Sequence, residues 1–254
     1  MMLAVFAGCG AQDQGEDNSL QKVLDAGKFV LGLDTEFPPM GFVDENGVIV
    51  GFDIDMAREV CDRLGVQLVL QGINWDEKEK ILERGDIDCI WNGLSVTPAR
   101  EEAMCLSDPY MKNEMIAVVR GESGILNLRD LKGKKIGVQH GSSAYEALQK
   151  TEIGKDVRII PYDNVITAIQ ELSKESIDAA LVDSVVAYYY IFSMPDSYYI
   201  LAESFDEEEY AIGFRKNDRK LRDKVQEIIS EMKADGTLGT ISKKWFGSDI
   251  TIVK

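Results

Sequence analysis

Short apolar runs alternate with amphipathic helical segments along most of this chain of 254 residues. The run 29–33 carries no polar side chain and ends at Asp34, the pattern of a strand buried on both faces of a parallel sheet. After the next helix come a strand at 66–70, a short charged helix at 75–85 and a strand at 87–91. Strand, helix, strand, helix and strand in this order predict an α/β unit with a parallel sheet.

A second unit of the same design begins near residue 117. Its expected strands are 116–119, 135–138, 157–160 and 177–182, and its expected helices are 128–131, a segment from 143, and 164–174. An internal similarity supports this division, because 85–90, GDIDCI, resembles 175–180, ESIDAA. The chain therefore predicts two lobes of like design.

The stretch 51–64, GFDIDMAREVCDRL, joins a tight turn to an amphipathic helix. Gly51 permits the turn, and Asp53 or Asp55 lies where a helix start favours an acid. One apolar stripe follows, formed by Ile54, Ala57, Val60, Cys61 and Leu64. The stretch resembles the signature of the solute-binding proteins of polar amino-acid ABC transporters, the bacterial extracellular solute-binding proteins of family 3.

That resemblance implies an α/β fold of the type II periplasmic-binding-protein kind, with two mostly parallel sheets flanked by helices and two hinge crossings. Residues 1–20 would be the remnant of a lipoprotein signal and its tether. The first lobe would comprise 21–116 and 209–254, and the second lobe 117–208. A strand expected at 210–214 and two later helices would complete the first lobe, and the lobes would close around a ligand.

Composition narrows the choice of partners. A net charge of −16 repels a phosphate backbone, so we expect no nucleic acid. One histidine, His140, and four dispersed cysteines provide no zinc-site spacing, and we expect neither a metal nor a cofactor. Cys61, Cys89 and Cys105 are odd in number, and we expect them to be free thiols.

The first nine residues form an apolar run that ends in 6–9, FAGC, and a polar stretch follows at 10–19. This arrangement is similar to a lipobox, in which Cys9 would be lipidated and would anchor an extracytoplasmic protein to the cell membrane; the alternative location is the periplasm. No Lys or Arg precedes Cys9, which departs from a lipoprotein signal. A functionless apolar N-terminus is the alternative.

Arg100 ends the stretch 93–100, GLSVTPAR, which is similar to the family stretch whose arginine grips the ligand's α-carboxylate. A guanidinium fits that role because its planar fork of donors matches a carboxylate. The resemblance implies that the Gly93 carbonyl and the Ser95 hydroxyl bind the ligand's ammonium and share in binding its carboxylate. From the residues alone, Arg100 is more simply a surface arginine, and Gly93 and Ser95 are turn residues.

Two positions in the second lobe would complete these contacts. Ser143 and Glu146 fit a capping box, and the helix start still offers backbone N–H groups to a carboxylate. The family places a serine or threonine here, with Ser142 as its neighbour. Asp183 matches the family acid that pairs with the α-ammonium, although it could equally cap the following helix.

The side-chain pocket is expected from Asp34, Glu36, Phe37 and Trp75, with Gln139 contributing from the other lobe. Phe37 and Trp75 could sandwich a flat or aliphatic group, or each could belong to the core. An ionised Asp34 in a closed cleft demands a cation or a strong donor. This favours arginine or lysine as the ligand, with glutamine or cystine next.

We therefore expect a monomeric binding protein that passes a polar, basic amino acid to an ABC permease and contacts the membrane only through its lipid. An enzyme like the cyclohexadienyl dehydratases is the second hypothesis, with Glu36 or Asp34 as its acid or base. Against it, His140 lacks an evident acid partner and no nucleophile motif is present. The ligand-binding lobe of a receptor is a third hypothesis. Neither 188–190 nor 206–209 is predicted as a site, and the acidic run 206–209 is expected to be a solvated loop.

Overall fold

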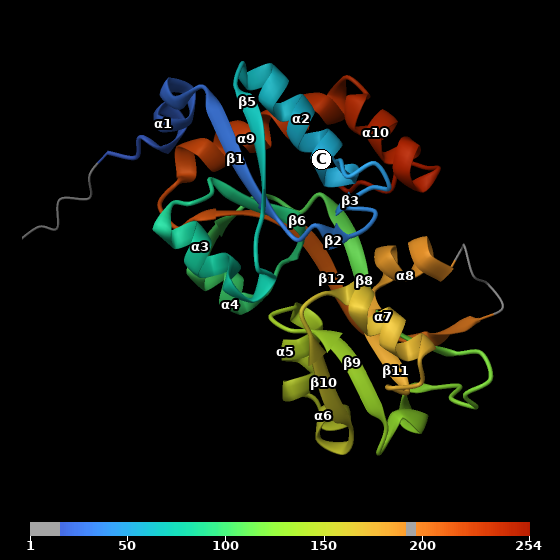
Figure 1. Ribbon diagram of the computed structural model, residues 1–254. Coiled ribbons are helices and arrows are strands. Elements are labelled where there is room, and N and C mark those ends of the chain that lie inside the picture. Colours follow the sequence, from blue (N-terminus) through green and yellow to red (C-terminus); the bar gives the residue numbers. More distant parts are fainter. Residues whose placement is uncertain (1–15, 192–196) are drawn as a thin grey trace, which may run out of the picture.

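The computed structural model describes residues 16–191 and 197–254, which form two lobes connected by two long strands, β8 (Met111–Arg120) and β12 (Tyr198–Arg215) (Figure 1). The helical elements of the first lobe are α1 (Ser19–Ala26), α2 (Phe52–Leu64), η1 (Trp75–Glu77), α3 (Lys78–Arg84), α4 (Pro98–Ala103), α9 (Arg219–Ala234) and α10 (Thr237–Phe246). Its strands are β1 (Lys28–Leu33), β2 (Glu36–Phe37), β3 (Gly41–Val43), β4 (Ile49–Val50), β5 (Gln67–Gly72), β6 (Cys89–Ser95) and β7 (Met104–Leu106).

The second lobe contains the remaining elements. Its helical elements are η2 (Leu128–Leu131), α5 (Ser143–Lys150), α6 (Glu152–Asp156), α7 (Val165–Ser173) and α8 (Ser184–Ile191), and its strands are β9 (Lys135–Gln139), β10 (Arg158–Tyr162) and β11 (Ala179–Asp183). The apolar periodicity thus predicts the type of the strands and helices in the two repeated units, with ends that differ by a few residues, whereas β12 is much longer than the strand expected at 210–214. At the other end of the chain, α9 and α10 pack against α1 and α2, so the tail lies in the first lobe.

Each lobe holds three parallel strands, in the order β5, β1, β6 in the first lobe and β10, β9, β11 in the second. Between these two groups run β8 and β12, which are antiparallel to each other and to their neighbours β11 and β6. Hydrogen bonding through β8 and β12 therefore joins the two predicted sheets into one sheet of nine strands, eight of them in a continuous path and the ninth, β7, paired to β12.

The acidic run 206–209 is part of β12, which corrects the prediction of a solvated loop. It pairs with 112–115 of β8, with Glu207 opposite Glu114. The sequence did not predict a strand here because charged residues lie on both faces of the segment. A strand that passes between two lobes has no continuous buried face, so it shows no alternating apolar pattern. The sequence pattern showed only its apolar end at 210–214.

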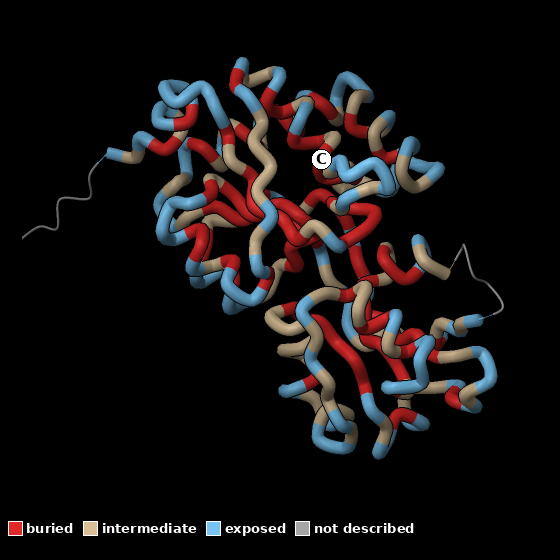
Figure 2. The backbone as a smooth tube through the Cα atoms, in the orientation of Figure 1, coloured by how far each residue is buried: buried red, intermediate tan, exposed pale blue. Residues whose placement is uncertain are grey.

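Buried residues follow the strands and the inward faces of the helices in both lobes (Figure 2). The strand β6 is buried along its whole length, and β1 is buried over most of its residues, as the apolar run predicted. On α2 the buried residues include the predicted stripe from Ile54 to Cys61. Cys61 and Cys89 are buried free thiols, and Cys105 is a half-buried one.

Asp53 has a structural role that its place in the first turn of α2 did not reveal. Gly51 precedes the helix with a φ of 150°, where a Cβ atom would lie 2.1 Å from the carbonyl oxygen of Met40. Asp53 is fully buried, and its Oδ2 accepts hydrogen bonds from the N–H of Gly93 (2.8 Å) and the hydroxyl of Tyr110 (3.0 Å). Burial raises the pKa of Asp53 to about 7. The motif thereby holds the C-terminal half of β6 in place.

Two predictions concern the N-terminal segment, the lipid anchor at Cys9 and the tether that follows it. Cys9 is outside the described residues, and α1 begins at Ser19, inside the expected tether. Within 16–191 and 197–254, no helix combines the length and the apolar character that a membrane crossing requires.

We predict that Asp53→Ala lowers the free energy of unfolding by about 2–4 kcal/mol, because two buried donors lose their acceptor. Chemical denaturation measures the change. Asp62→Ala is the matched control, since Asp62 is exposed on the same helix, and it should change stability by less than about 0.5 kcal/mol. Equal stabilities for the two variants would contradict the assigned role of Asp53.

Candidate ligand-binding site

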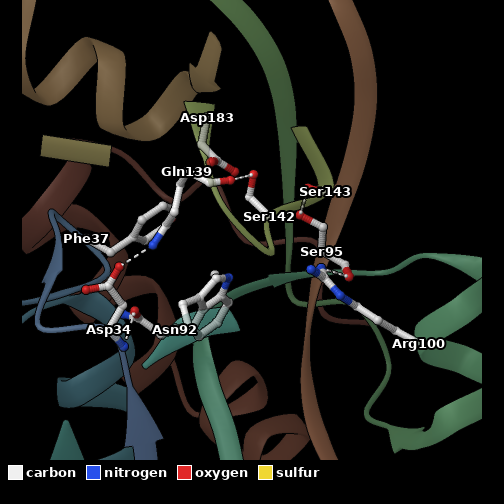
Figure 3. Close-up of a pocket in the computed structure, with 11 residues that line it drawn as sticks. Asp34, Phe37, Asn92, Ser95, Arg100, Gln139, Ser142, Ser143 and Asp183 are labelled. Atoms are coloured by element: carbon white, nitrogen blue, oxygen red, sulfur yellow. Dashed lines mark hydrogen bonds between the residues drawn. The ribbon is translucent and has the colours of Figure 1, made fainter. Parts of the chain in front are cut away.

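A pocket with about 280 Å³ of space free of protein atoms, its opening to solvent included, lies between the two lobes at the carboxyl ends of parallel strands (Figure 3). It is lined by Asp34, Phe37, Trp75, Asn92, Gly93, Ser95 and Arg100 from the first lobe and by Gln139, Ser142, Ser143 and Asp183 from the second. All of the predicted ligand-binding residues except Glu36 are therefore brought together here. In open α/β sheets the strand ends are where ligands bind, which is why the search of those positions found them.

Glu36 does not line the pocket, and Asn92 does although it was not predicted. Successive side chains of a strand point to opposite sides, so Phe37 of β2 faces the pocket and Glu36 is exposed. The carboxylate of Glu36 instead accepts a hydrogen bond from Asn164 Nδ2 at 2.5 Å. Asn92 Oδ1 accepts the backbone N–H of Asp34 at 3.1 Å, and its position directly after the strand predicted at 87–91 was the signal available in the sequence.

Arg100 is only 4% exposed, which contradicts its interpretation as a surface arginine. Its Nη1 donates to the Ser95 carbonyl at 2.8 Å, and its Nη2 lies 3.5 Å from the Gly141 carbonyl of the second lobe. Its Nε has no hydrogen-bond partner among the described residues. Burial lowers the pKa of Arg100 from its usual value. A buried guanidinium with donor capacity to spare is suited to an anionic group in the pocket.

The start of α5 differs by one residue from the predicted capping box. Ser142 is the N-cap residue, and its Oγ accepts the N–H of Tyr145 at 3.1 Å and donates to the Gln139 carbonyl at 2.7 Å. Ser143 is therefore the first helical residue, and its hydroxyl donates to Ser95 Oγ at 3.1 Å across the two lobes. Glu146 pairs with Lys150 at 3.5 Å, so the predicted reciprocal cap was wrong.

Asp183 ends β11 and is 7% exposed. Its Oδ1 accepts hydrogen bonds from the hydroxyl of Tyr210 (2.5 Å) and from Asn113 Nδ2 (2.7 Å). Burial, followed by repulsion from Glu208, raises the pKa of Asp183 to about 7. A cation beside this carboxylate would relieve part of the cost of its burial.

Glu208 belongs to the site region although sequence analysis placed it in a solvated loop. Its Oε2 accepts the hydroxyl of Ser95 at 2.7 Å and Asn113 Nδ2 at 3.3 Å. Hydrogen bonds thus run from Ser143 through Ser95, Glu208 and Asn113 to Asp183. This chain of contacts connects both lobes through the strands that join them.

The far end of the pocket contains a second buried acid. Asp34 Oδ2 accepts a hydrogen bond of 2.6 Å from Gln139 Nε2, which is a direct contact between the lobes. Burial raises the pKa of Asp34. Phe37 and Trp75 line the pocket and are also more than nine-tenths buried among core residues, so a place in the core and a place in the pocket wall do not exclude each other.

His140, which the sequence left without an acid partner, does have one: its Nδ1 lies 2.9 Å from Asp76 Oδ1 of the first lobe. Neither residue lines the pocket. Within the described ranges, no group of histidine, cysteine, aspartate and glutamate side chains could hold a metal ion.

A family model named for bacterial extracellular solute-binding proteins, family 3, matches residues 29–248. The chain belongs to this family. The L-cystine-binding protein TcyJ of Escherichia coli K12 is 33% identical over 99% of this chain and 94% of its own. The predicted family is thereby confirmed.

Solved structures agree. The crystal structure of Tv2483 bound to L-arginine has a TM-score of 0.91 and 33% identity, covering 94% of this chain and 98% of its own. An ABC uptake transporter substrate-binding protein from Streptococcus pneumoniae with bound histidine has a TM-score of 0.87 and 36% identity, covering 93% of this chain and 99% of its own. The predicted two-lobed α/β fold is thereby confirmed.

We predict that Asp183→Asn stabilises the ligand-free protein, because it removes a buried carboxylate that is costly to ionise. A folded-state pKa near 7, above the ordinary 3.8, means that the folded protein holds an extra proton between these values. The loss of folding stability caused by ionising Asp183 is absent below pH 4, grows as the pH rises and is complete above about pH 7. The variant should gain about 1–3 kcal/mol at pH 8. Denaturation at pH 4, 6 and 8 tests this, and a wild-type-to-variant difference that is constant with pH would refute it.

Proposed function

We propose that this protein captures a polar amino acid between its two lobes and delivers it to an ABC permease. The observation that carries the proposal is the pairing, within one pocket, of a buried guanidinium, Arg100, with a buried carboxylate, Asp183. A zwitterion carries the two opposite charges that such a pocket requires.

In this proposal Arg100 holds the ligand's α-carboxylate through its outward donors. The backbone N–H groups at the start of α5, beside Ser142 and Ser143, hold the same carboxylate from the second lobe. Asp183 and the Gly93 carbonyl take the α-ammonium. Each lobe therefore binds part of the ligand's α-amino and α-carboxylate groups. The two lobes must approach each other for the full set of contacts to form.

Binding and lobe closure are then one equilibrium. The closed arrangement brings Ser143 to Ser95 and Gln139 to Asp34, and a ligand that contacts both lobes favours this state over the open one. We place the hinge within β8 and β12, near 116–117 and 208–209, where both strands pass between the lobes. Register shifts in β12 between Ile200 and Asp206 provide irregular pairing beside this position.

Asp34 is the proposed determinant of ligand choice. A carboxylate at the end of the pocket favours a ligand with a cationic side chain, so arginine or lysine is the first choice and glutamine or cystine the alternative. The names of similar proteins give arginine for Tv2483, histidine for the Streptococcus pneumoniae protein and cystine for TcyJ. The dehydratase hypothesis gains nothing from the pocket, because Glu36, one of its two candidate acids, lies outside it.

The proposed location is extracytoplasmic, in keeping with the family. We place a lipid anchor at Cys9, followed by the polar residues up to α1 as a tether, and we propose that the protein works as a monomer.

We predict that Arg100→Ala and Asp183→Ala each weaken binding of the preferred amino acid by about 3–5 kcal/mol, because each leaves a desolvated ligand charge unpaired. This corresponds to about two to four decades in Kd, measured by titration calorimetry. Arg58→Ala is the control, since that side chain is 52% exposed. Circular dichroism verifies that every variant is folded, and a loss below tenfold in a folded variant would exclude the residue from the site.

We predict that Asp34→Asn lowers affinity for arginine and lysine by at least about tenfold and affinity for glutamine by much less, because only the former lose an ionic partner. A thermal-shift screen with the twenty amino acids, ornithine and cystine identifies ligands first, and calorimetry with three of them follows. Asp62→Asn is the surface control. An equal loss for all ligands would remove Asp34 from the specificity role.

A further inference from the structure

A second set of contacts joins the lobes outside the pocket. The turn after β9 lies against η1 and the start of α3, so that His140 Nδ1 is 2.9 Å from Asp76 Oδ1 and Lys78 Nζ donates to the Gly141 carbonyl at 2.8 Å. None of these four residues lines the pocket. The contacts therefore depend on the lobes being closed and need no contact with a ligand.

Lys78 is unusual because its side chain is only 3% exposed. Its ammonium also donates to the Trp75 carbonyl at 3.2 Å, lies 5.1 Å from the centroid of the Trp75 ring and pairs with Glu79 at 3.2 Å. Burial of an ammonium is costly unless its donors are used. Here one N–H of the Lys78 ammonium donates to the opposite lobe, so the Gly141 carbonyl takes the place of a water molecule around the buried charge.

Gly141 is shaped for this close approach. A Cβ atom at this position would lie 2.8 Å from Asp76 Cα and 3.0 Å from Asp76 Oδ1, so any side chain would press against the first lobe. Its φ of 68° is also one that glycine adopts without strain. The same carbonyl lies 3.5 Å from Arg100 Nη2, so this contact adjoins the guanidinium that is proposed to hold the ligand's carboxylate.

We propose that Asp76, Lys78, His140 and Gly141 form a closing clasp that stabilises the closed state without touching the ligand. The inference rests on the proposed function, because it assigns to the clasp a part of the binding free energy. Contacts that exist only in the closed state raise apparent affinity by shifting the open-to-closed equilibrium. Because the clasp contacts do not touch the ligand, they raise the apparent affinity by the same factor for every amino acid. Lys78 is thus a positioning residue that sets affinity, whereas the pocket sets selectivity.

The main test is Lys78→Met, which keeps an unbranched apolar side chain of nearly the same length and removes the ammonium. We expect affinity to fall roughly tenfold, as for a hydrogen bond to a charged group, and equally for three ligands of different side chain. The loss should appear in the dissociation rate, since the open state that first meets the ligand is unchanged. Lys80→Met, at an exposed position two residues later on α3, is the control and should bind like the wild type.

The His140–Asp76 pair gives an independent test on exposed side chains that do not endanger folding. Asp76→Ala and His140→Ala should each weaken binding about two- to fivefold, because each removes one hydrogen bond between the lobes. The double variant should lose no more than either single one, because the two residues act through each other. Additive losses, or none, would remove this pair from the clasp.

Small-angle scattering separates failure of the clasp from failure of the proposed function. If no amino acid compacts the wild-type protein, the proposed function fails. If amino acids compact the wild type and Lys78→Met binds them equally well, the clasp is overturned. Changed selectivity in Lys78→Met also overturns it, because the ammonium would then act on the ligand itself. The expected result is a variant that closes less completely at the same ligand excess, with its selectivity intact.

Discussion

The structure depends on keeping two opposite charges buried on facing lobes. Arg100 and Asp183 line one pocket and are both more than nine-tenths buried, which costs free energy unless each is well hydrogen-bonded. Arg100 has the Ser95 carbonyl, and Asp183 has Tyr210 and Asn113. These supports leave part of each group's capacity unused, including Arg100 Nε. A binding protein needs such unused capacity, since a fully satisfied pair would gain nothing from a ligand.

The strands that connect the lobes also build the site. Tyr210 and Glu208 belong to β12 and Asn113 belongs to β8, so the partners of Asp183 and Ser95 come from the connection itself. Bending of these strands would therefore change the surroundings of the acid along with the distance between the lobes. In the proposed mechanism the hinge and the ammonium site therefore share these two strands, which couples ligand charge to lobe position.

Local pattern was enough to predict most of the fold and the pocket. Apolar runs ending in polar residues located the strand ends, and those ends are where Asp34, Gln139 and Asp183 lie. Prediction failed where the cause was not local. The partner of Glu208, Ser95, is 113 residues away in sequence, and the partner of His140 is in the other lobe. The shift of the α5 cap from Ser143 to Ser142 has another cause: adjacent serines can both cap, and only the backbone decides which one does.

Affinity and selectivity then have separate physical origins in this protein. In the proposed mechanism Asp34 contacts the variable end of the ligand, whereas the clasp contacts only protein, and Gly141 is the point where the clasp meets Arg100. Side chains that line the pocket can therefore change ligand preference without disturbing closure. Residues in η1 and α3 can change the strength of closure without disturbing preference. A scaffold arranged in this way can bind chemically different amino acids with the same closing motion, because the free energy of closure does not depend on the ligand's side chain.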